Sequence, residues 1–423
     1  MDSDLIYWLW LTIAFGPANS RKWNTLSHYA SVKEAYESIS SGNLKFVMPQ
    51  DITSVKSAEM ERAQKLAEYC KSKRINIYCF DDAEYPAGLK EIYNPPSVLF
   101  AVGDISVIND SVVLACVGTR TPSEYSVRVT ERICSRLADT GVVIASGMAP
   151  GLDSIALKAG IKAGGKVVSV LPCGMFYDYP KNGAALKRAV SANGVVISEF
   201  FPDEASTGKN FHARNRILSG ISMGTLVTQA GEKSGALSTA SFASGQGRDV
   251  FCIPPHILYS DKYSGVTGLL RDGAIPVFDE RDVLNEYYSV YSHKLNQNSL
   301  VLRQKSKEGI FSESRKQPSR ASKPARSVRE EASKQPQIKE SDTDGMPSAK
   351  TSDSNGIHSV KVINTDGLSE EKKKIIEFVS ENGAVHFEDI ASLSDWTQDV
   401  ETMLTDLELE GYIKSLSGNR YTI

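Results

Sequence analysis

The chain has 423 residues, of which 41% are hydrophobic and 23% are charged, values typical of a globular protein of two or three domains. Its 48 Lys and Arg residues nearly balance its 51 Asp and Glu residues, which excludes a polycation that binds nucleic acid through bulk charge. The six cysteines show no C-x-x-C spacing, which excludes a zinc site built on such pairs and predicts buried thiols in a reducing compartment.

The N-terminal segment begins with an apolar run from Leu5 to Phe15. Asp2 and Asp4 stand where a secretion signal carries cations, and the run is shorter than the roughly 20 apolar residues that span a bilayer. We therefore expect a buried helix in a cytoplasmic protein with no membrane partner. A helical apolar period between Met60 and Cys70 completes a helical N-terminal domain, predicted for residues 1–75.

The central part of the chain alternates apolar, β-branched runs with segments one helix long. The runs lie at 112–118, 142–147, 166–174, 195–200, 225–230 and 249–254. Continuous apolar strands separated by helices indicate a parallel sheet that is covered on both faces. The pattern predicts an α/β domain over residues 76–295, with a Rossmann-like, doubly wound and mostly parallel sheet.

Three of these runs end in turns of small residues that lead into a helix. The turn residues are Gly118 and Arg120 after the first run, Ser146 and Gly147 after the second, and Ser234 and Gly235 after the fifth. Free backbone N–H groups and the helix dipole make such turns favourable sites for an anion. One glycine turn is more often explained by backbone geometry. Three turns in one domain favour a ligand with several phosphates.

The common nucleotide-binding motifs are absent from these turns. No strand is followed by G-x-G-x-x-G, and the segment "GIKAGGKV" at 160–167 ends in Val167 and lies between a helix and a strand, the reverse of a P-loop. We therefore expect no cofactor, no metal and no catalytic residues.

The segment "NFHARNRILSG" at 210–220 places Arg214 and Arg216 on either side of Asn215, shortly after Phe211. A guanidinium offers a planar fork of donors that suits phosphate oxygens. We expect both arginines to contact phosphates near the strand ends. The structural alternative is a salt bridge to Glu199 or Asp203.

The C-terminal part divides by composition and charge. Residues 303–365 hold 13 Lys and Arg against 8 Asp and Glu, a net of +5, with one aromatic residue, which predicts a disordered linker. Residues 366–423 hold 5 against 13, a net of −8, in a helix and strand order typical of a winged-helix-like domain. The expected recognition helix, at about 397–410, has no Lys or Arg, so we expect the domain to contact another protein or to self-associate, and not to bind DNA.

Several motifs occur in an order that resembles the DNA-processing protein A family, also called DprA or Smf. Between residues 78 and 290 they include "VGTR", "SGMAPGLDSIAL", "LPCGMFYDYPKN", "FHARNRILSGIS" and "SGALSTASFASGQGRDVFCIP". The resemblance implies a protein that binds single-stranded DNA, protects strands taken up in natural transformation and delivers them to the RecA recombinase. It also implies a homodimer formed through the Rossmann-like domain, and a single-strand-binding protein is a further candidate partner.

The resemblance assigns roles to particular residues. Arg120 matches the arginine of the family's G-S/T-R motif, while Lys181, Arg214 and Arg216 match basic positions that line the family's binding pocket, with Asn182 beside Lys181. Phe211 matches the apolar residue that precedes the "RNR" motif. The chain departs from the family at three positions, which are Leu157, Gln229 and Pro255.

Two other functions remain open on the sequence. The first is a nucleotide hydrolase of a related Rossmann-like fold, which needs a carboxylate on the helix after the phosphate turn, but the segment "SGALSTASFASGQG" contains none. The second is a nucleotide-sensing regulator that uses the acidic C-terminal domain as its output. It predicts tight binding of small nucleotides without dependence on oligonucleotide length.

Overall fold

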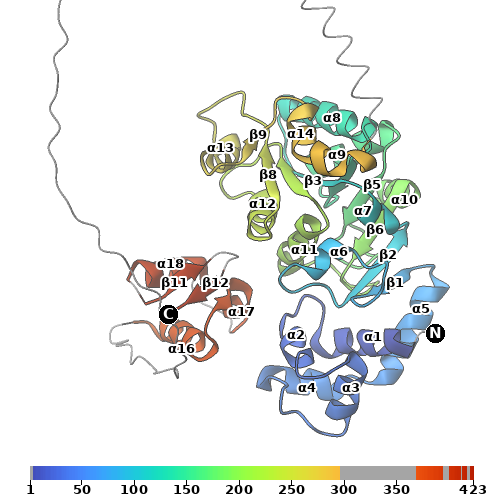
Figure 1. The fold of residues 1–423 in the computed structure, drawn as a ribbon, viewed down its shortest axis with the longest axis vertical. Helices are drawn as coiled ribbons and strands as arrows, with labels where there is room; N and C mark the ends of the chain where they lie inside the picture. The colour runs from blue at the N-terminus through green and yellow to red at the C-terminus, as the bar shows by residue number, and fades with distance from the viewer. Residues whose placement is uncertain (1–2, 296–367, 394–399, 411, 417–419) are drawn as a thin grey trace, which may run out of the picture.

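The structure is a computed structural model that describes residues 3–295, 368–393, 400–410, 412–416 and 420–423 (Figure 1). The predicted linker at 303–365 lies outside the described residues. The N-terminal part forms five helices, followed by a large α/β core and a small C-terminal domain.

The N-terminal helices are α1 (Ser3–Phe15), α2 (Arg21–Leu26), α3 (Val32–Ser40), α4 (Ile52–Ser57) and α5 (Met60–Ser72). Helix α1 is the buried helix expected from the apolar run, because Trp8, Leu9, Trp10 and Leu11 are each at most 3% exposed. Within the described part of the chain, no helix combines the length and the apolar character needed to cross a membrane.

The core contains a nine-stranded sheet in the order β1-β2-β6-β5-β4-β3-β7-β8-β9. The strands are β1 (Asn76–Cys79), β2 (Val98–Gly103), β3 (Val113–Val117), β4 (Val143–Ser146), β5 (Val167–Val170), β6 (Gly194–Ser198), β7 (Gly224–Val227), β8 (Asp249–Cys252) and β9 (Ile275–Pro276). Strands β3 to β9 pair in parallel, which confirms the predicted Rossmann-like α/β fold. Chain order reverses beside β3, so the carboxyl ends of β3, β4 and β7 lie next to one another.

Helices cover both faces of the sheet, which explains why the strands are apolar without interruption. One face packs against α8 (Glu124–Asp139), α9 (Leu152–Lys162), α10 (Ala184–Asn193), α14 (Glu280–Tyr291) and the N-terminal helices. The other face packs against α6 (Ala87–Lys90), α7 (Ser106–Asp110), α11 (Gly208–Gly220), α12 (Gly235–Gly245) and α13 (Ser264–Arg271). Along β3, Leu114 and Cys116 belong to the first layer, whereas Val113, Ala115 and Val117 belong to the second.

Strands β1 and β2, at one side of the sheet, were not among the predicted runs, and neither was the two-residue strand β9 at the opposite edge. Strands β1 and β2 join the sheet in antiparallel pairs, β1 with β2 and β2 with β6. Both neighbours of β2 in the sheet are antiparallel to it. The alternation of strands and helices that predicts the parallel strands therefore does not predict β1 and β2.

The C-terminal domain has the predicted order of elements: α16 (Glu370–Asn382), β10 (Val385–His386), α17 (Phe387–Ala391), α18 (Val400–Leu409), β11 (Lys414–Leu416) and β12 (Arg420–Thr422). Its strands form a separate sheet in the order β10-β12-β11. Apolar residues of its helices, among them Ile375, Val379, Leu404 and Leu407, form a core of their own.

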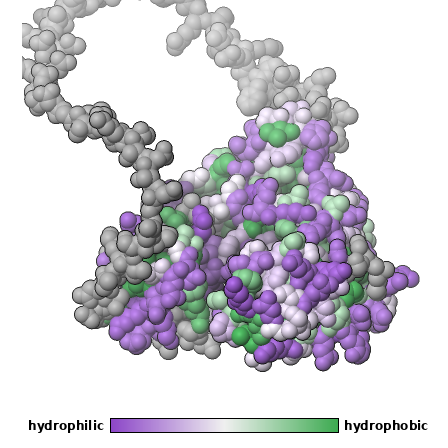
Figure 2. Space-filling model, turned by 60° about the horizontal axis from the view of Figure 1, so that its bottom comes forward, coloured by the Kyte–Doolittle hydropathy of each residue, from purple (hydrophilic) through white to green (hydrophobic). Residues whose placement is uncertain are grey.

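Figure 2 shows the molecule turned so that the bottom of Figure 1 comes forward. This face is mainly hydrophilic, with small separate hydrophobic patches.

Candidate nucleic-acid interface

A pocket of about 830 Å³ opens beyond the carboxyl ends of β3 and β7. Its walls come from the turn after β3, the turn between β7 and α12, the first half of α11 and the loop before α13. Of the residues proposed from the sequence, seven line it together: Gly118, Arg120, Phe211, Arg214, Asn215, Ser234 and Gly235. Ligands bind at this place in open α/β sheets, at the point where chain order reverses.

The turn after β3 is fixed by backbone bonds to its neighbours. The Thr119 N–H donates to the Gln229 carbonyl (2.8 Å), and the Leu152 N–H donates to the Thr119 carbonyl (3.2 Å). Gly151 has a φ of +87°, and a Cβ there would lie 2.5 Å from the Thr119 carbonyl oxygen. Only glycine fits this close approach, so the two turns are held together as one wall of the pocket.

Arg214 is buried at the inner end of the pocket, with 4% of its surface exposed. Its Nη1 donates to the carbonyls of Gly147 (2.7 Å) and Val170 (2.5 Å), and its Nε donates to Oδ1 of Asn215 (3.1 Å). Among the described residues, no carboxylate oxygen lies within 4.0 Å of its nitrogens, and Nη2 has no hydrogen-bond partner. The guanidinium is thus held in place by neutral groups, without an ion pair.

The electrostatics of Arg214 follow from this position. Burial lowers the pKa of Arg214, and the charge of Asp153 only partly opposes that effect. A buried cation without a paired anion is unfavourable, and an incoming phosphate would relieve the cost. The pocket is therefore suited to an anion at Nη2.

Helix α12 contributes its N-terminus to the same pocket. Ser234 is its N-cap and accepts the Ala236 N–H, and Gly235 begins the helix. The Asn215 amide donates to the Ser238 hydroxyl (2.7 Å) and thereby joins α11 to α12. The first turn of α12 adds the positive end of a helix dipole to the charge of Arg214.

The outer part of the pocket combines a cation with an aromatic ring. Arg120 is exposed, and its guanidinium carbon lies 5.1 Å from the centroid of the Phe211 ring. Phe211 is half-buried and packs edge-on against Tyr179. A flat group and a charge at the mouth suit a nucleic-acid strand, which presents bases and phosphates alternately.

Arg216 does not enter this pocket, so the expectation that both arginines face one ligand is not met. Its Nη2 donates to both carboxylate oxygens of Glu199 (2.9 and 2.8 Å), and both side chains are at most 1% exposed. Glu199 also accepts the Ala18 N–H (2.9 Å), and Lys22 lies 3.7 Å away. This is the salt bridge that the sequence allowed as the structural alternative.

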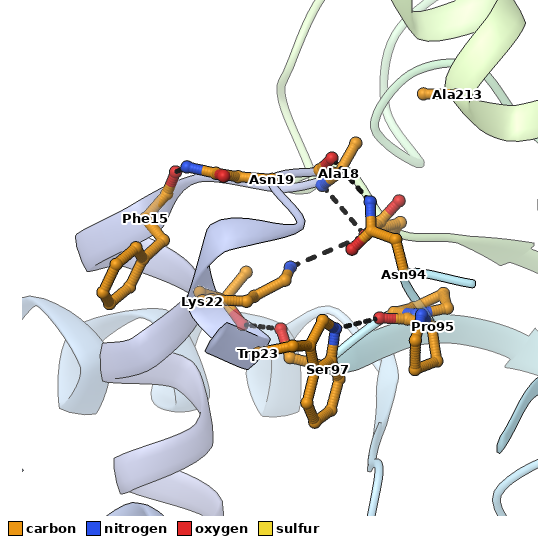
Figure 3. A network of polar contacts seen from close by, with 12 residues as sticks. Phe15, Ala18, Asn19, Lys22, Trp23, Asn94, Pro95, Ser97 and Ala213 are labelled. Carbon is orange, nitrogen blue, oxygen red and sulfur yellow. Dashed lines mark hydrogen bonds and ion pairs between the residues drawn. The ribbon is translucent and has the colours of Figure 1, made fainter. Parts of the chain in front are cut away.

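Figure 3 shows the surroundings of this ion pair, where Lys22 and Ala18 of the N-terminal part meet Asn94 of the core. The Asn94 amide donates to the Ala18 carbonyl (2.8 Å), and the Trp23 indole donates to the Pro95 carbonyl (2.9 Å). Arg216 therefore belongs to the junction between the N-terminal helices and the core.

Four other proposed residues also lie outside the pocket lining. The Ser146 hydroxyl is buried and donates to the Cys116 carbonyl (2.6 Å), so it is not available to a ligand. Gly147 lies beneath Arg214, where a Cβ would be 2.3 Å from the guanidinium nitrogens. Lys181 and Asn182 are exposed on the loop before α10 and do not line the pocket.

Among the pocket residues that were not proposed from the sequence are two cations and a buried amide. Lys233 and Lys262 are exposed cations at the rim. Gln229 is 1% exposed, and its Oε1 accepts the Ser123 N–H (2.9 Å), which leaves its NH₂ group as a further donor. Lys233 lies in the turn between β7 and α12, directly before Ser234, and could have been found there, whereas Lys262 reaches the pocket from a distant loop without a local signal.

Three carboxylates line the pocket, compared with four cations, and one of the three is buried and hydrogen-bonded. Asp153 is buried, and its Oδ2 accepts the Gly147 N–H (3.2 Å). Burial raises the pKa of Asp153, and Arg214 opposes that effect. Glu232 and Asp261 lie at the exposed rim.

Residues 76–288, which include the whole pocket, match the protein family described as DNA recombination-mediator protein A. DNA processing protein DprA of Bacillus subtilis (strain 168) is 36% identical over 222 residues, which are 52% of this chain and 74% of that protein. DNA processing protein DprA of Streptococcus pneumoniae (strain ATCC BAA-255 / R6) is 36% identical over 229 residues, which are 54% and 79% of the two chains. The X-ray structure of DNA processing protein A from Streptococcus pneumoniae is similar with a TM-score of 0.57 and 29% identity, over 66% of this chain and 95% of that chain.

Proposed function

This chain belongs to the DNA recombination-mediator protein A family, and we propose that it binds single-stranded DNA in the pocket beyond β3 and β7. The single observation that carries the proposal is the environment of Arg214. Its guanidinium is buried, has no carboxylate within 4.0 Å among the described residues, and lines the pocket with Nη2 left without a hydrogen-bond partner. A phosphate of the DNA backbone supplies the missing negative charge.

The preference for a single strand rests on the mouth of the pocket. Phe211, beside Arg120, offers a ring on which a base can stack only when that base is not enclosed in a duplex. Arg120, Lys233 and Lys262 follow the phosphates outside the deep site. Four cations would then meet phosphates, counting Arg214.

For the role of the complex we propose what the resemblance to the family implies. The bound strand is protected and passed to the RecA recombinase during natural transformation, with a homodimer as the active assembly and a single-strand-binding protein as a further partner. We assign no catalytic step to the pocket, because Asp153 is tied to the Gly147 N–H and α12 carries no carboxylate.

Fluorescence anisotropy with a labelled oligothymidylate, compared with a duplex of equal length, tests the proposal. The single strand should bind at least about tenfold more tightly, because base stacking contributes about 1–3 kcal/mol per base. Phe211→Ala should reduce this preference for the single strand, while Phe242→Ala, on the other side of α12, serves as an aromatic control. Equal binding of the two forms of DNA would contradict the proposal.

The same assay separates the alternatives. A nucleotide-sensing regulator would bind a mononucleotide as tightly as an oligonucleotide, whereas the proposed site should gain affinity with each added nucleotide up to its full length. A hydrolase would release free base from nucleoside monophosphates at a steady rate. We expect neither mononucleotide saturation at low concentration nor release of base.

A further inference from the structure

The C-terminal domain lies against the junction between the N-terminal helices and the core. In Figure 1, α17 is the helix of this domain that faces α2. The ring of His386 stacks on Tyr93, with the centroids 3.7 Å apart and the planes at 11°. Asp389 accepts hydrogen bonds from the Ser20 hydroxyl (2.6 Å) and from the Tyr93 hydroxyl. The contact is small, polar and made by a single acidic turn.

The junction beneath this turn has more positive than negative charge. Arg216 and Lys22 share the single carboxylate of Glu199, and all three side chains are at most 1% exposed. Nε of Arg216 is buried without a hydrogen-bond partner, and Nζ of Lys22 makes no hydrogen bond to accompany its 3.7 Å ion pair. Two buried cations on one anion leave an excess charge that a second carboxylate would balance.

The C-terminal domain brings such a carboxylate to the same place. Arg216, Tyr93, Gln246 and His386 line a cavity of about 80 Å³ between the domain and the core. Burial raises the pKa of Glu388, and the charge of Arg216 opposes that rise, so the two groups act on one another across the contact. Oε1 of Glu388 and Oε1 of Gln246 are buried without partners, as Nε of Arg216 is. The contact therefore buries polar groups of both the domain and the core that are not fully hydrogen-bonded.

We propose that the junction formed by Ser20, Arg21, Tyr93 and Arg216 is a docking site for an acidic turn, and that its partner is Glu388 and Asp389 of the same chain. Docking is intramolecular and reversible. The 72 residues at 296–367 join the domain to the core, and a chain of that length spans far more than the contact requires. The net charge of −8 over residues 366–423 favours a cationic junction and disfavours DNA.

The charges on the two sides are complementary. Asp389 acts together with Asp51 to raise the pKa of Arg21, with the Asp51 hydrogen bond as the largest cause. Nη1 of Arg21 also donates to the Ser392 hydroxyl (3.4 Å) at the end of the acidic turn. When the turn leaves, Arg21 keeps its ion pair with Asp51 and Arg216 keeps its ion pair with Glu199. Undocking therefore restores the excess positive charge of the junction but breaks no ion pair of the core.

Energy transfer between two dyes in the full chain tests the docking. Dyes are placed at Lys33→Cys on α3 and Ser380→Cys on α16, both exposed positions, and the six native cysteines are buried. The test variant is Glu388→Gln with Asp389→Asn. The matched control is Glu377→Gln with Glu381→Gln, which removes two exposed carboxylates from α16 of the same domain. A third variant, Tyr93→Ala, changes the docking site and leaves the C-terminal domain intact.

The proposal predicts efficient transfer in the unaltered chain at low salt and a fall at high salt. The ratio of docked to undocked chain should fall at least about tenfold in the test variant and in Tyr93→Ala, and remain unchanged in the control. Transfer that persists in the Glu388→Gln, Asp389→Asn variant or in Tyr93→Ala would overturn the proposal. Transfer that depends on protein concentration would also overturn it, because it would place the domain on a second copy. No DNA is present, so the result is independent of the function proposed for the pocket.

Discussion

Arg214 and Arg216 lie two residues apart on α11 and have opposite environments. An α-helix turns by about 100° per residue, so side chains at i and i+2 point to nearly opposite sides. Arg214 points toward the strand ends and bonds to carbonyls, whereas Arg216 points toward the N-terminal helices and bonds to Glu199. The first is available to a ligand, and the second is part of the fold.

Replacing each arginine by methionine should separate these roles. Arg216→Met leaves Glu199 with only Lys22 and the Ala18 N–H, and should lower the free energy of unfolding by about 2–4 kcal/mol. Arg214→Met removes a buried cation that has no ion pair, and should change that free energy by no more than about 1 kcal/mol. Urea denaturation followed by tryptophan fluorescence measures both. The opposite ranking would contradict the assignment.

Lys22 should give the stability a distinct pH dependence. Burial lowers the pKa of Lys22 from 10.5 to about 8, while Glu199 opposes the shift. The unfolded chain then binds more protons than the folded chain between about pH 8 and 10.5, so stability should rise across this window, by about 3 kcal/mol. Below pH 8 both states carry the charge, and the cost of burying it is fully present.

Lys22→Met should therefore be more stable than the unaltered chain at pH 7, and its stability should lack this rise. Denaturation midpoints measured at intervals from pH 7 to 10.5 check the prediction. The exposed Lys33→Met provides the control, because the side chain of Lys33 is 54% exposed. Parallel pH profiles for all three proteins would show that Lys22 is not a buried cation.

At the scale of elements, α11 connects the pocket to the junction. Its N-terminal half carries Phe211 and Arg214, and its next turn carries Arg216. Gly147, at the end of β4, sets how closely the Arg214 guanidinium approaches the sheet. The position of the guanidinium is thus determined by a strand end and a helix together.

Gly147→Ala should displace Arg214. The added Cβ would lie 2.3 Å from both terminal nitrogens, so the guanidinium must move away from the Gly147 and Val170 carbonyls. Affinity for a single strand should fall by about tenfold, since one charge-assisted contact is worth roughly 1.5–3 kcal/mol. Gly208→Ala at the start of α11 meets no atom within 4 Å and serves as the control. Unchanged affinity in Gly147→Ala would argue against the site.

Some strands could be predicted from the sequence and others could not, for a physical reason. Strands β3 to β8 are apolar on both faces and alternate with helices, so their pattern is visible without tertiary information. The turns at Gly118 and Gly235 could be placed for the same reason, since they follow such strands. Strands β1 and β2 join the sheet in antiparallel pairs, and no local pattern in the sequence indicates that β2 pairs with β6.

The candidate site was predicted less completely than the fold. The helical spacing of Arg214 and Arg216 could have shown that they point to different sides, but which of the two arginines pairs with Glu199 is decided only in the folded chain. Lys262 enters the pocket through a loop far along the chain. Contacts of this kind depend on tertiary structure and not on local sequence.

At the scale of the whole molecule, the cationic sites arise from where the charged residues lie and not from an excess of positive charge. The chain is close to neutral, yet the pocket gathers Arg120, Arg214, Lys233 and Lys262, while the acidic C-terminal domain rests on a second cationic place at the junction. Separate cationic places allow DNA and the acidic turn to be bound without direct competition for the same side chains.

The salt dependence of binding tests the role of Arg214 most directly. With four cations on phosphates, the logarithm of the association constant of the unaltered chain for an oligothymidylate should fall against the logarithm of salt concentration with a slope of about −2 to −3. Arg214→Met should reduce the steepness by about 0.7 and the affinity by at least about tenfold. An identical slope and affinity in the unaltered chain and in Arg214→Met would contradict the claim that this buried guanidinium holds a phosphate.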